Sequence, residues 1–292
     1  MEYYYELCGS RICVETDGDA YSQHGVLAPF LTTPGDVDHR FVFVLSQTLP
    51  PPQGQCLYRD TGMQIYRQGE QILRYVGAAD EQHSATHMII ARRGAESRVQ
   101  CRHSAYPCGI TPKTVLNALE AEHLIIRNGG IILHASFICW KDQAILFTAP
   151  SGTGKSTQAE LWCRLQGAEL INGDRAAIRM EKGRAYAWGI PFAGSSGVGK
   201  SGKYPLRAVV YLSQAPNNDV VNLSGLEAFR KVWEGCSVNV WDKEDVALGS
   251  QIVIDVLKSV PVYHLACTPD QKAVETLLAT LEREGDWDGK SN

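Results

Sequence analysis

The sequence predicts a mixed α/β protein (α+β overall) in which a phosphate-binding-loop domain follows a smaller β-rich domain. Three observations favour this fold class. Short apolar segments separated by turn residues fill positions 1–110. Helical patterns alternate with strand-like runs farther along the chain. A glycine-rich segment at 149–157 lies between one such strand and the next helix. We therefore expect two domains, 1–110 and 111–292, with a joining helix at 111–128 in the second.

The composition is that of a globular protein with a small negative charge. Of 292 residues, 44% are hydrophobic and 21% are charged, and the formal net charge is −4. Lysine and arginine form no block, so a broad nucleic-acid-binding surface is not expected. No apolar run is long enough to span a bilayer, and the first residues lack the pattern of a signal peptide. We predict a cytoplasmic protein without membrane or nucleic-acid partners, whose nine cysteines are reduced.

The first 110 residues contain strand candidates separated by glycines. Residues 3–7 and 11–15 flank Gly9-Ser10 and predict an opening hairpin. The further strand candidates are 41–45, 62–67, 71–76, 86–91 and 98–102. None of these segments carries the spacing of a catalytic motif.

Two groups of side chains in this region could bind a ligand, but each has a simpler interpretation. The tyrosines at 3–5 are typical of half-buried sheet positions. Cys101, His103 and Cys108 form the cluster that suggests a metal. They lack a Cys-x-x-Cys pair, and ordinary thiols near a strand and a turn are the better interpretation.

The joining helix at 111–128 has signals at both ends. Thr111 is a good N-cap, and Pro112 is favoured at the first helical position. Apolar residues recur at helical spacing from Val115 to Ile125. Gly129-Gly130 is expected to end the helix.

The segment 149–157 reads Ala-Pro-Ser-Gly-Thr-Gly-Lys-Ser-Thr and is typical of a phosphate-binding loop. An apolar run precedes it and a helix-like run follows, which is the order that this motif requires. The glycines let successive backbone N–H groups point at phosphate oxygens, and the positive N-terminus of the following helix adds attraction. Lys155 would neutralise the β- and γ-phosphates, and the Ser156 hydroxyl would bind the bridging Mg²⁺. The predicted ATP-binding residues are Ser151, Gly152, Thr153, Gly154, Lys155, Ser156 and Thr157.

The strands around this loop supply one acidic candidate. Strands are expected at 131–138 and 143–147, and the second leads into the loop. After the loop helix, a short strand at 167–171 leads to Asn172-Gly173-Asp174. Ligands of open α/β sheets bind beyond the carboxyl ends of strands, so Asp174 could bind Mg²⁺ or orient an attacking hydroxyl. Asn-Gly-Asp is also typical of a plain turn, and both interpretations stay open.

The rest of the chain predicts further strands and three helices. The expected elements are a meander at 176–192, a core strand at 206–212, helices at 224–235 and 242–258, a strand at 260–266 and a last helix from 270. Ser224-x-x-Glu227 predicts a capping box for the first of these helices. Asp242 and Asp270 are the expected N-caps of the other two.

Residues 194–201 satisfy the G-x-x-x-x-G-K-[ST] pattern that is typical of phosphate-binding loops. No strand leads into them, and Gly202 and Pro205 oppose a helix after them. We therefore predict that they do not form a second nucleotide loop. Two alternatives stay open, a mobile loop that reaches over a substrate and a plain solvent-exposed loop.

The region 130–178 resembles the catalytic domain of HPr kinase/phosphorylase and its relatives, which share a nucleotide-binding fold with phosphoenolpyruvate carboxykinase. The resemblance rests on the Leu-His-Ala-Ser run at 133–136, the loop at 151–157 and the Gly-Ala-x-Leu-Ile strand that leads to Asp174. A Gly-x-Pro followed by a Gly/Ser loop, at 189–201, is similar to the wider group of HPr-kinase-like proteins of unknown substrate.

This resemblance implies a P-loop fold of the phosphoenolpyruvate-carboxykinase-like type and roles for particular residues. Lys155 and Ser156 would hold the phosphates and Mg²⁺, and Asp174 would assist the attacking hydroxyl or share the metal. His134 would lie near the phosphates, although a histidine in an apolar strand, taken alone, is more often a core residue. The catalytic residues implied are thus Asp174, His134 and Lys155.

The resemblance also implies an activity. The implied activity is that of an ATP- and Mg²⁺-dependent kinase, which transfers the γ-phosphoryl group to a hydroxyl. Serine of a peptide or small protein is favoured as the acceptor over a small molecule. Relatives of this type assemble into homo-oligomers through the catalytic domain. The chain departs from the family at Gly173, where a second acid is usual. This departure favours, as an alternative, a nucleotide-binding regulatory protein without transfer activity; an ATPase that drives a partner is a third hypothesis.

Overall fold

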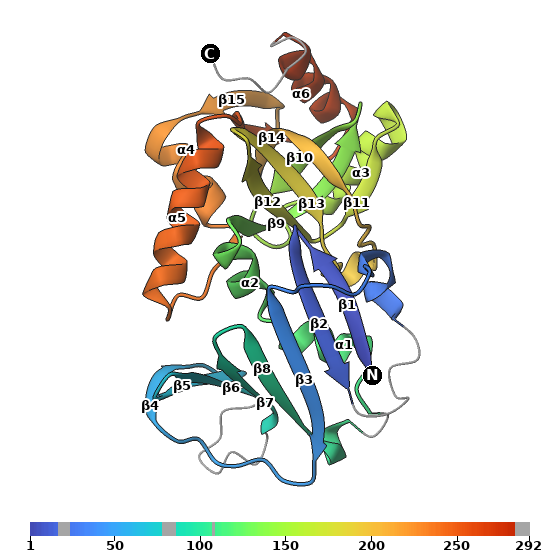
Figure 1. Ribbon diagram of the computed structural model, residues 1–292. Helices are drawn as coiled ribbons and strands as arrows, with labels where there is room; N and C mark the ends of the chain where they lie inside the picture. The colour runs from blue at the N-terminus through green and yellow to red at the C-terminus, as the bar shows by residue number, and fades with distance from the viewer. Residues whose placement is uncertain (17–23, 78–85, 107–108, 284–292) are drawn as a thin grey trace. The chain divides into compact units, whose positions relative to one another are not determined.

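The computed structural model describes residues 1–16, 24–77, 86–106 and 109–283. The chain divides into two compact units, Met1–Leu124 and Ile125–Asn292 (Figure 1). Each unit has its own sheet and hydrophobic core, as a mixed α/β chain requires. The division falls within a short helix, α2 (Ala121–Arg127), and not at residue 110.

The first unit is built on an eight-stranded sheet with the order β1-β2-β3-β8-β7-β6-β5-β4. Its strands are β1 (Glu2–Leu7), β2 (Ser10–Thr16), β3 (His39–Ser46), β4 (Gln55–Arg59), β5 (Met63–Gln68), β6 (Gln71–Gly77), β7 (Thr86–Arg93) and β8 (Glu96–Arg102). The pairs β2–β3 and β3–β8 are parallel, and the other neighbours are antiparallel. The expected β-rich region is confirmed, while β4 and the 3-10 helix Gly25–Phe30 were not predicted.

The side chains considered as ligand candidates in this unit belong to its core or to the elements next to it. Tyr5 is fully buried in the core. Cys101 is a buried free thiol on β8, and His103 begins a short 3-10 helix after it. Cys108 lies outside the described residues.

Two-residue turns with both residues in the left-handed conformation join three of the hairpins. They are Cys8-Gly9, Lys141-Asp142 and Lys182-Gly183, with φ between 48° and 80°. Turns with positive φ at both central positions match the twist of the strands they connect. The hairpins expected around these turns are confirmed.

The helix expected over 111–128 is two helices, α1 (Pro112–Ala118) and α2. The Thr111 hydroxyl caps α1 by accepting from the Thr114 N–H at 3.2 Å, as predicted. A continuous helix was wrong because Glu120 adopts φ 45°, which breaks the helical path. Its buried carboxylate lies 3.4 Å from the Arg92 guanidinium on β7, so a tertiary ion pair accompanies the break.

The second unit is a mixed sheet flanked by helices. Its strands are β9 (Gly130–Trp140), β10 (Gln143–Thr148), β11 (Glu169–Asn172), β12 (Arg175–Glu181), β13 (Arg184–Gly189), β14 (Lys203–Gln214), β15 (Asp219–Leu223), β16 (Cys236–Ser237) and β17 (Val262–Cys267). The main order is β10-β9-β12-β13-β14-β17-β15, and β11 and β16 also pair with β9. Because β10 pairs with both β9 and β14, the five strands from β10 to β14 in this order close on themselves.

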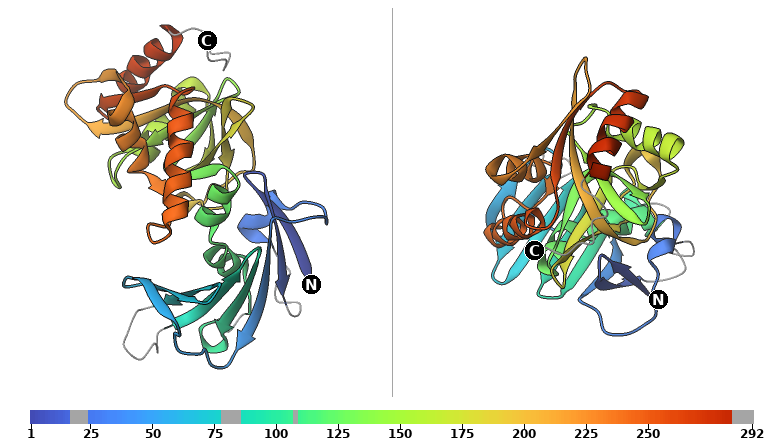
Figure 2. Two further views of the ribbon diagram at one scale, coloured as in Figure 1. Left: turned by 60° about the vertical axis from the view of Figure 1, so that its left-hand side comes forward. Right: turned by 90° about the horizontal axis from the view of Figure 1, so that it is seen from above.

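The helices of this unit lie against the sheet (Figure 2). Two hydrophobic clusters hold them there. One includes residues of α4 (Gly225–Trp233) and α5 (Lys243–Leu257), and the other includes residues of α3 (Lys155–Gln166) and α6 (Gln271–Arg283). The strands β10, β14 and β17 are parallel neighbours, so their carboxyl ends meet at one edge. The phosphate-loop sequence starts at this edge, directly after β10.

Most of the expected elements of this unit are confirmed, with differences at helix ends and short strands. Asp242 and Asp270 accept hydrogen bonds from the first N–H groups of α5 and α6, as predicted. Ser224 occupies the N-cap position of α4, but its side chain makes no capping hydrogen bond, so the capping box is wrong. Gly225, the first helical residue, has φ +56°, a geometry unlike that of a regular first turn. The strands β15 and β16 were not predicted. None of the described helices is both long and apolar enough to cross a membrane.

Candidate nucleotide-binding site

The segment 149–157 forms a tight loop between β10 and α3. Gly154 is the N-cap of α3, and Lys155 is its first residue. Gly152 and Gly154 have φ of 78° and 118°, conformations that other residues rarely adopt. No atom lies within 4 Å of the place that a Cβ would take at either glycine. Backbone conformation, and not lack of space, therefore requires glycine at both positions.

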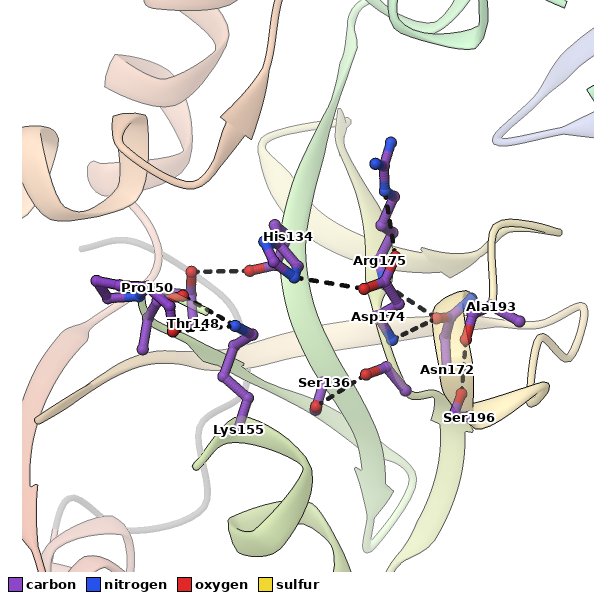
Figure 3. A network of polar contacts seen from close by, with 12 residues as sticks. His134, Ser136, Thr148, Pro150, Lys155, Asn172, Asp174, Arg175, Ala193 and Ser196 are labelled. Carbon is purple, nitrogen blue, oxygen red and sulfur yellow. Dashed lines mark hydrogen bonds and ion pairs between the residues drawn. The ribbon is translucent and has the colours of Figure 1, made fainter. Parts of the chain in front are cut away.

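Lys155 is buried and its ammonium group lies inside the loop (Figure 3). Its Nζ donates to the carbonyl of Ala149 at 2.9 Å and to that of Pro150 at 3.4 Å. Burial lowers the pKa of Lys155, and the Asp174 carboxylate opposes this effect. The cation thus rests on weakly negative carbonyl oxygens, for which phosphate oxygens would be stronger replacements.

A cavity of about 300 Å³ collects most of the predicted site residues. It is lined by His134, Ser151, Gly152, Gly154, Lys155, Ser156, Thr157, Gly173 and Asp174. We call it the phosphate cavity. Thr153 does not line it, because its hydroxyl donates to the Pro150 carbonyl at 2.9 Å and the residue faces a neighbouring cavity.

His134 and Asp174 form a pair at the edge of the phosphate cavity (Figure 3). The imidazole Nε2 lies 3.3 Å from one carboxylate oxygen, and the other oxygen lies 3.3 Å from Nε of Arg175. Burial and then the nearby Lys155 ammonium lower the pKa of His134, while Asp174 opposes them. The imidazole is therefore neutral near pH 7. The side chain is 41% exposed, so the interpretation of His134 as a core residue is wrong.

Asn172 fixes the turn that carries Asp174. Its side chain is fully buried at the end of β11. The carboxamide oxygen accepts from the N–H groups of Asp174 and Arg175 at 2.8 and 2.9 Å. The amide nitrogen donates to the Ile190 carbonyl at 2.8 Å. The Asn-Gly-Asp sequence is thus a turn, and this turn is held beside the phosphate cavity.

The neighbouring strand β9 holds the same turn from the other side. The Ser136 hydroxyl donates to the Gly173 carbonyl at 3.1 Å, and the Ala135 N–H donates to the Asp174 carbonyl at 2.9 Å. The Thr148 hydroxyl donates to the His134 carbonyl at 2.9 Å and so ties the end of β10 to β9. These bonds fix the backbone of both His134 and Asp174.

Four residues that support this site were not predicted from its local motifs. Asn172, Ser136, Thr148 and Arg175 hold or contact the predicted residues, but none was assigned a role. A signal existed for two of them. Thr148 and Asn172 are polar residues that follow apolar residues at the last position of their strands, where a side chain can reach the adjoining turn.

The second pattern match, at 194–201, has a different structure. It begins with the 3-10 turn Gly194–Ser196 and leads into β14, without a helix after it. Lys200 is exposed and its Nζ lies 2.6 Å from Glu169 on the surface. These residues do not line the phosphate cavity, which supports the prediction that they are not a second nucleotide loop.

This second loop nevertheless contacts the site through Gly194 and Ser196. A Cβ at Gly194 would lie 2.6 Å from Cγ of Asp174, so only a glycine lets the loop approach that side chain. A Cβ at Gly173 would lie 2.3 Å from the Ser196 hydroxyl oxygen. Ser196 therefore occupies the space that a side chain at position 173 would need. The loop is more than a solvent-exposed connection, because it packs on the residues around Asp174.

One protein family matches this chain. A family described as SynChlorMet cassette protein ScmC matches residues 115–277. The chain belongs to this family. No curated protein matches it.

One solved structure of low similarity is the HPr(Ser) kinase/phosphatase from Coxiella burnetii. It is 15% identical, with a TM-score of 0.30, over 52% of this chain and 88% of that one.

Proposed function

We propose that this protein is an ATP- and Mg²⁺-dependent kinase that transfers the γ-phosphoryl group of ATP to a hydroxyl. A serine of a peptide or small protein is the favoured acceptor, and a small-molecule hydroxyl is the nearest variant. One observation carries the proposal. The glycine loop, its lysine, and the His134–Asp174 pair line a single cavity at the carboxyl end of β10.

The residues of the phosphate cavity fit a triphosphate with its metal. Loop N–H groups, the N-terminus of α3 and the Lys155 ammonium provide positive charge for phosphate oxygens. The Ser156 hydroxyl and the Asp174 carboxylate line the same cavity, and such oxygen ligands are those that Mg²⁺ prefers. When bound, Mg²⁺ would neutralise charge on the β- and γ-phosphates.

Asp174 would act on the acceptor. Its carboxylate would orient the attacking hydroxyl and accept its proton, as the new bond from oxygen to the γ-phosphorus forms and the bond to the β–γ bridging oxygen breaks. ADP then leaves with the electron pair of the broken bond, and Asp174 returns its proton to water. The neutral imidazole of His134, 3.3 Å away, can donate from Nε2 and keep the carboxylate oriented.

A nucleotide-binding regulator without transfer activity is the second candidate. The observation that favours it is Gly173, since this position carries no acid and Ser196 fills the adjacent space. Under this alternative, the same cavity would bind the nucleotide and no acceptor would be modified.

Incubation with ATP labelled at the γ-phosphate, Mg²⁺ and the peptide fraction of the source cell tests the proposal. Transfer of label to an acceptor, lost in Lys155→Ala, is the expected result. Release of phosphate alone would indicate an ATPase, and binding without either product would indicate a regulator. Either of these outcomes would contradict the kinase proposal, and so would transfer that survives Lys155→Ala.

A further inference from the structure

A second cavity, of about 400 Å³, lies on the other side of the phosphate loop. It shares Gly152, Gly154 and Thr157 with the phosphate cavity, so the loop forms a common wall. Its other walls come from the start of α3 and from the carboxyl ends of β14 and β17. Its volume is within the range of small-molecule sites.

The order of the strands indicates in which direction a nucleotide bound at the loop would extend. β9, which carries His134, pairs with one edge of β10, and the parallel strands β14 and then β17 follow at the other edge. The His134–Asp174 pair therefore marks one end of the loop, and the second cavity marks the opposite end. A triphosphate whose γ-phosphate meets Asp174 would extend its nucleoside toward β14 and β17.

The wall of the second cavity contains a buried carboxamide whose oxygen has no hydrogen-bond partner. Gln158 on α3 lines the cavity and is 2% exposed. Its Nε2 makes long contacts, 3.4 Å to Sγ of Cys267 and 3.5 Å to the carbonyl oxygen of Thr268. Its Oε1 is buried without a hydrogen-bond partner. Exchanging the two amide atoms would turn an oxygen toward the Thr268 carbonyl, so the group that lacks a partner is an acceptor. Native proteins rarely leave such an atom unpaired without a reason.

We propose that the second cavity is a subsite for the nucleoside of the bound triphosphate, and that Gln158 Oε1 accepts a hydrogen bond from the amino group of an adenine base. Carboxamides recognise adenine well, because it offers an amino donor beside a ring acceptor. Gln158 is thereby a specificity-determining residue. This inference rests on the proposed binding of ATP at the loop.

Calorimetric titration of the full chain with three Mg²⁺ complexes tests the subsite. The ligands are ATP, inorganic tripolyphosphate, and purine riboside triphosphate, which lacks the 6-amino group. We expect ATP to bind about tenfold more tightly than purine riboside triphosphate, the scale of one net hydrogen bond, and tripolyphosphate to bind weakest. This comparison uses the unaltered chain and does not depend on how a variant folds.

A pair of variants tests whether Gln158 causes the preference for ATP over purine riboside triphosphate. Gln158→Met should remove the advantage of ATP over purine riboside triphosphate and leave tripolyphosphate binding unchanged. Gln166→Met, at the end of the same helix and away from the cavity, should keep the advantage. Equal binding of ATP and tripolyphosphate by the unaltered chain would overturn the subsite alone. An amino-group preference that persists in Gln158→Met would overturn the role of Gln158, and failure of all three ligands to bind would overturn the proposed function itself.

Discussion

Two stretches of this chain, 149–157 and 194–201, contain the same pattern of glycine, lysine and serine, and they have different structures. The first follows β10 and opens α3, so its N–H groups and helix terminus converge on one cavity. The second begins with a 3-10 turn and leads into β14, with no helix after it. The pattern fixes which side chains are present, and the flanking elements decide whether these side chains can surround a phosphate.

The two lysines show the same contrast. Lys155 is 7% exposed and its ammonium contacts loop carbonyls, whereas Lys200 is an exposed partner of Glu169. The second loop has a different part in the site, since Gly194 packs on Asp174 and Ser196 packs on Gly173. The loop 194–201 therefore contacts the candidate site although it does not line the phosphate cavity.

The largest expected effect separates the two lysines. Lys155→Ala should lower phosphoryl transfer by roughly 10²-fold or more, because it removes the cation that stabilises the phosphates. Lys200→Ala is the matched control. It removes only a surface ion pair and should change the free energy of unfolding by less than about 1 kcal/mol and leave transfer unchanged. Steady-state rates and thermal unfolding of both variants measure this, and equal losses in both would contradict the contrast.

Asp174 is the next most sensitive position. Asp174→Asn keeps the shape of the side chain but removes its ability to accept a proton, so transfer should fall by ~10²-fold or more. Binding of ATP in the absence of Mg²⁺ should persist, since Lys155 and the loop are unchanged. Rates and titration on one preparation separate the two effects, and a variant with normal transfer would remove Asp174 from the mechanism.

The contact between Ser196 and Gly173 predicts that the effect of an acidic residue at position 173 on stability depends on the residue at position 196. Gly173→Asp should destabilise the protein by about 1–3 kcal/mol, because its Cβ would overlap Ser196. Ser196→Gly in the same chain should recover most of this loss and make room for a second acid. Chemical denaturation of the two single variants and the double variant measures the coupling, and additive effects would show that Ser196 does not fill this space.

The smallest effect concerns the dependence of stability on pH. The pKa of His134 is lowered in the folded state by burial and by Lys155, so the unfolded chain binds the proton first as pH falls below about 6.5. The free energy of unfolding should therefore decrease below that pH, and it should decrease less in His134→Gln. Well above the unfolded-state pKa, from about pH 7.5 upward, this residue should contribute almost no slope.

Variants of the two lysines provide a further test of this pH dependence. Lys155→Ala should weaken the pH effect of His134, because it removes a cation that lowers that pKa, and Lys200→Ala should not. Tryptophan fluorescence follows the second unit selectively, since all six tryptophans lie at position 140 or beyond. A fall in stability at low pH that is the same with and without His134 would contradict this assignment.

Local signals in the sequence were sufficient for much of the fold. Gly9 and Gly183 marked hairpin turns, Thr111 and Asp242 marked helix starts, and the loop at 149–157 was placed correctly between a strand and a helix. These features depend on residues within one or two turns of each other. The break at Glu120 was missed because it involves Arg92, which is distant in the sequence.

The site residues proposed from the sequence lie together in the structure, whereas the residues that hold them in place were not predicted. His134, Lys155 and Asp174 do line one cavity, although nothing in their local sequence fixes their distances. The bonds of Asn172 to two N–H groups and to Ile190, and the contact of Ser196 with Gly173, arise from three-dimensional packing. Such contacts cannot be inferred from spacing along a single chain.

Hydrogen exchange in the presence of Mg²⁺ and ATP tests the central contrast most directly. Bound phosphates would accept hydrogen bonds from the backbone N–H groups of residues 151–157 and slow their exchange. We predict strong protection in this segment, absent in Lys155→Ala, and little direct protection in 194–201. Protection confined to 194–201, or the absence of any protection at saturating ATP, would contradict the assignment of 149–157 as the phosphate-binding loop.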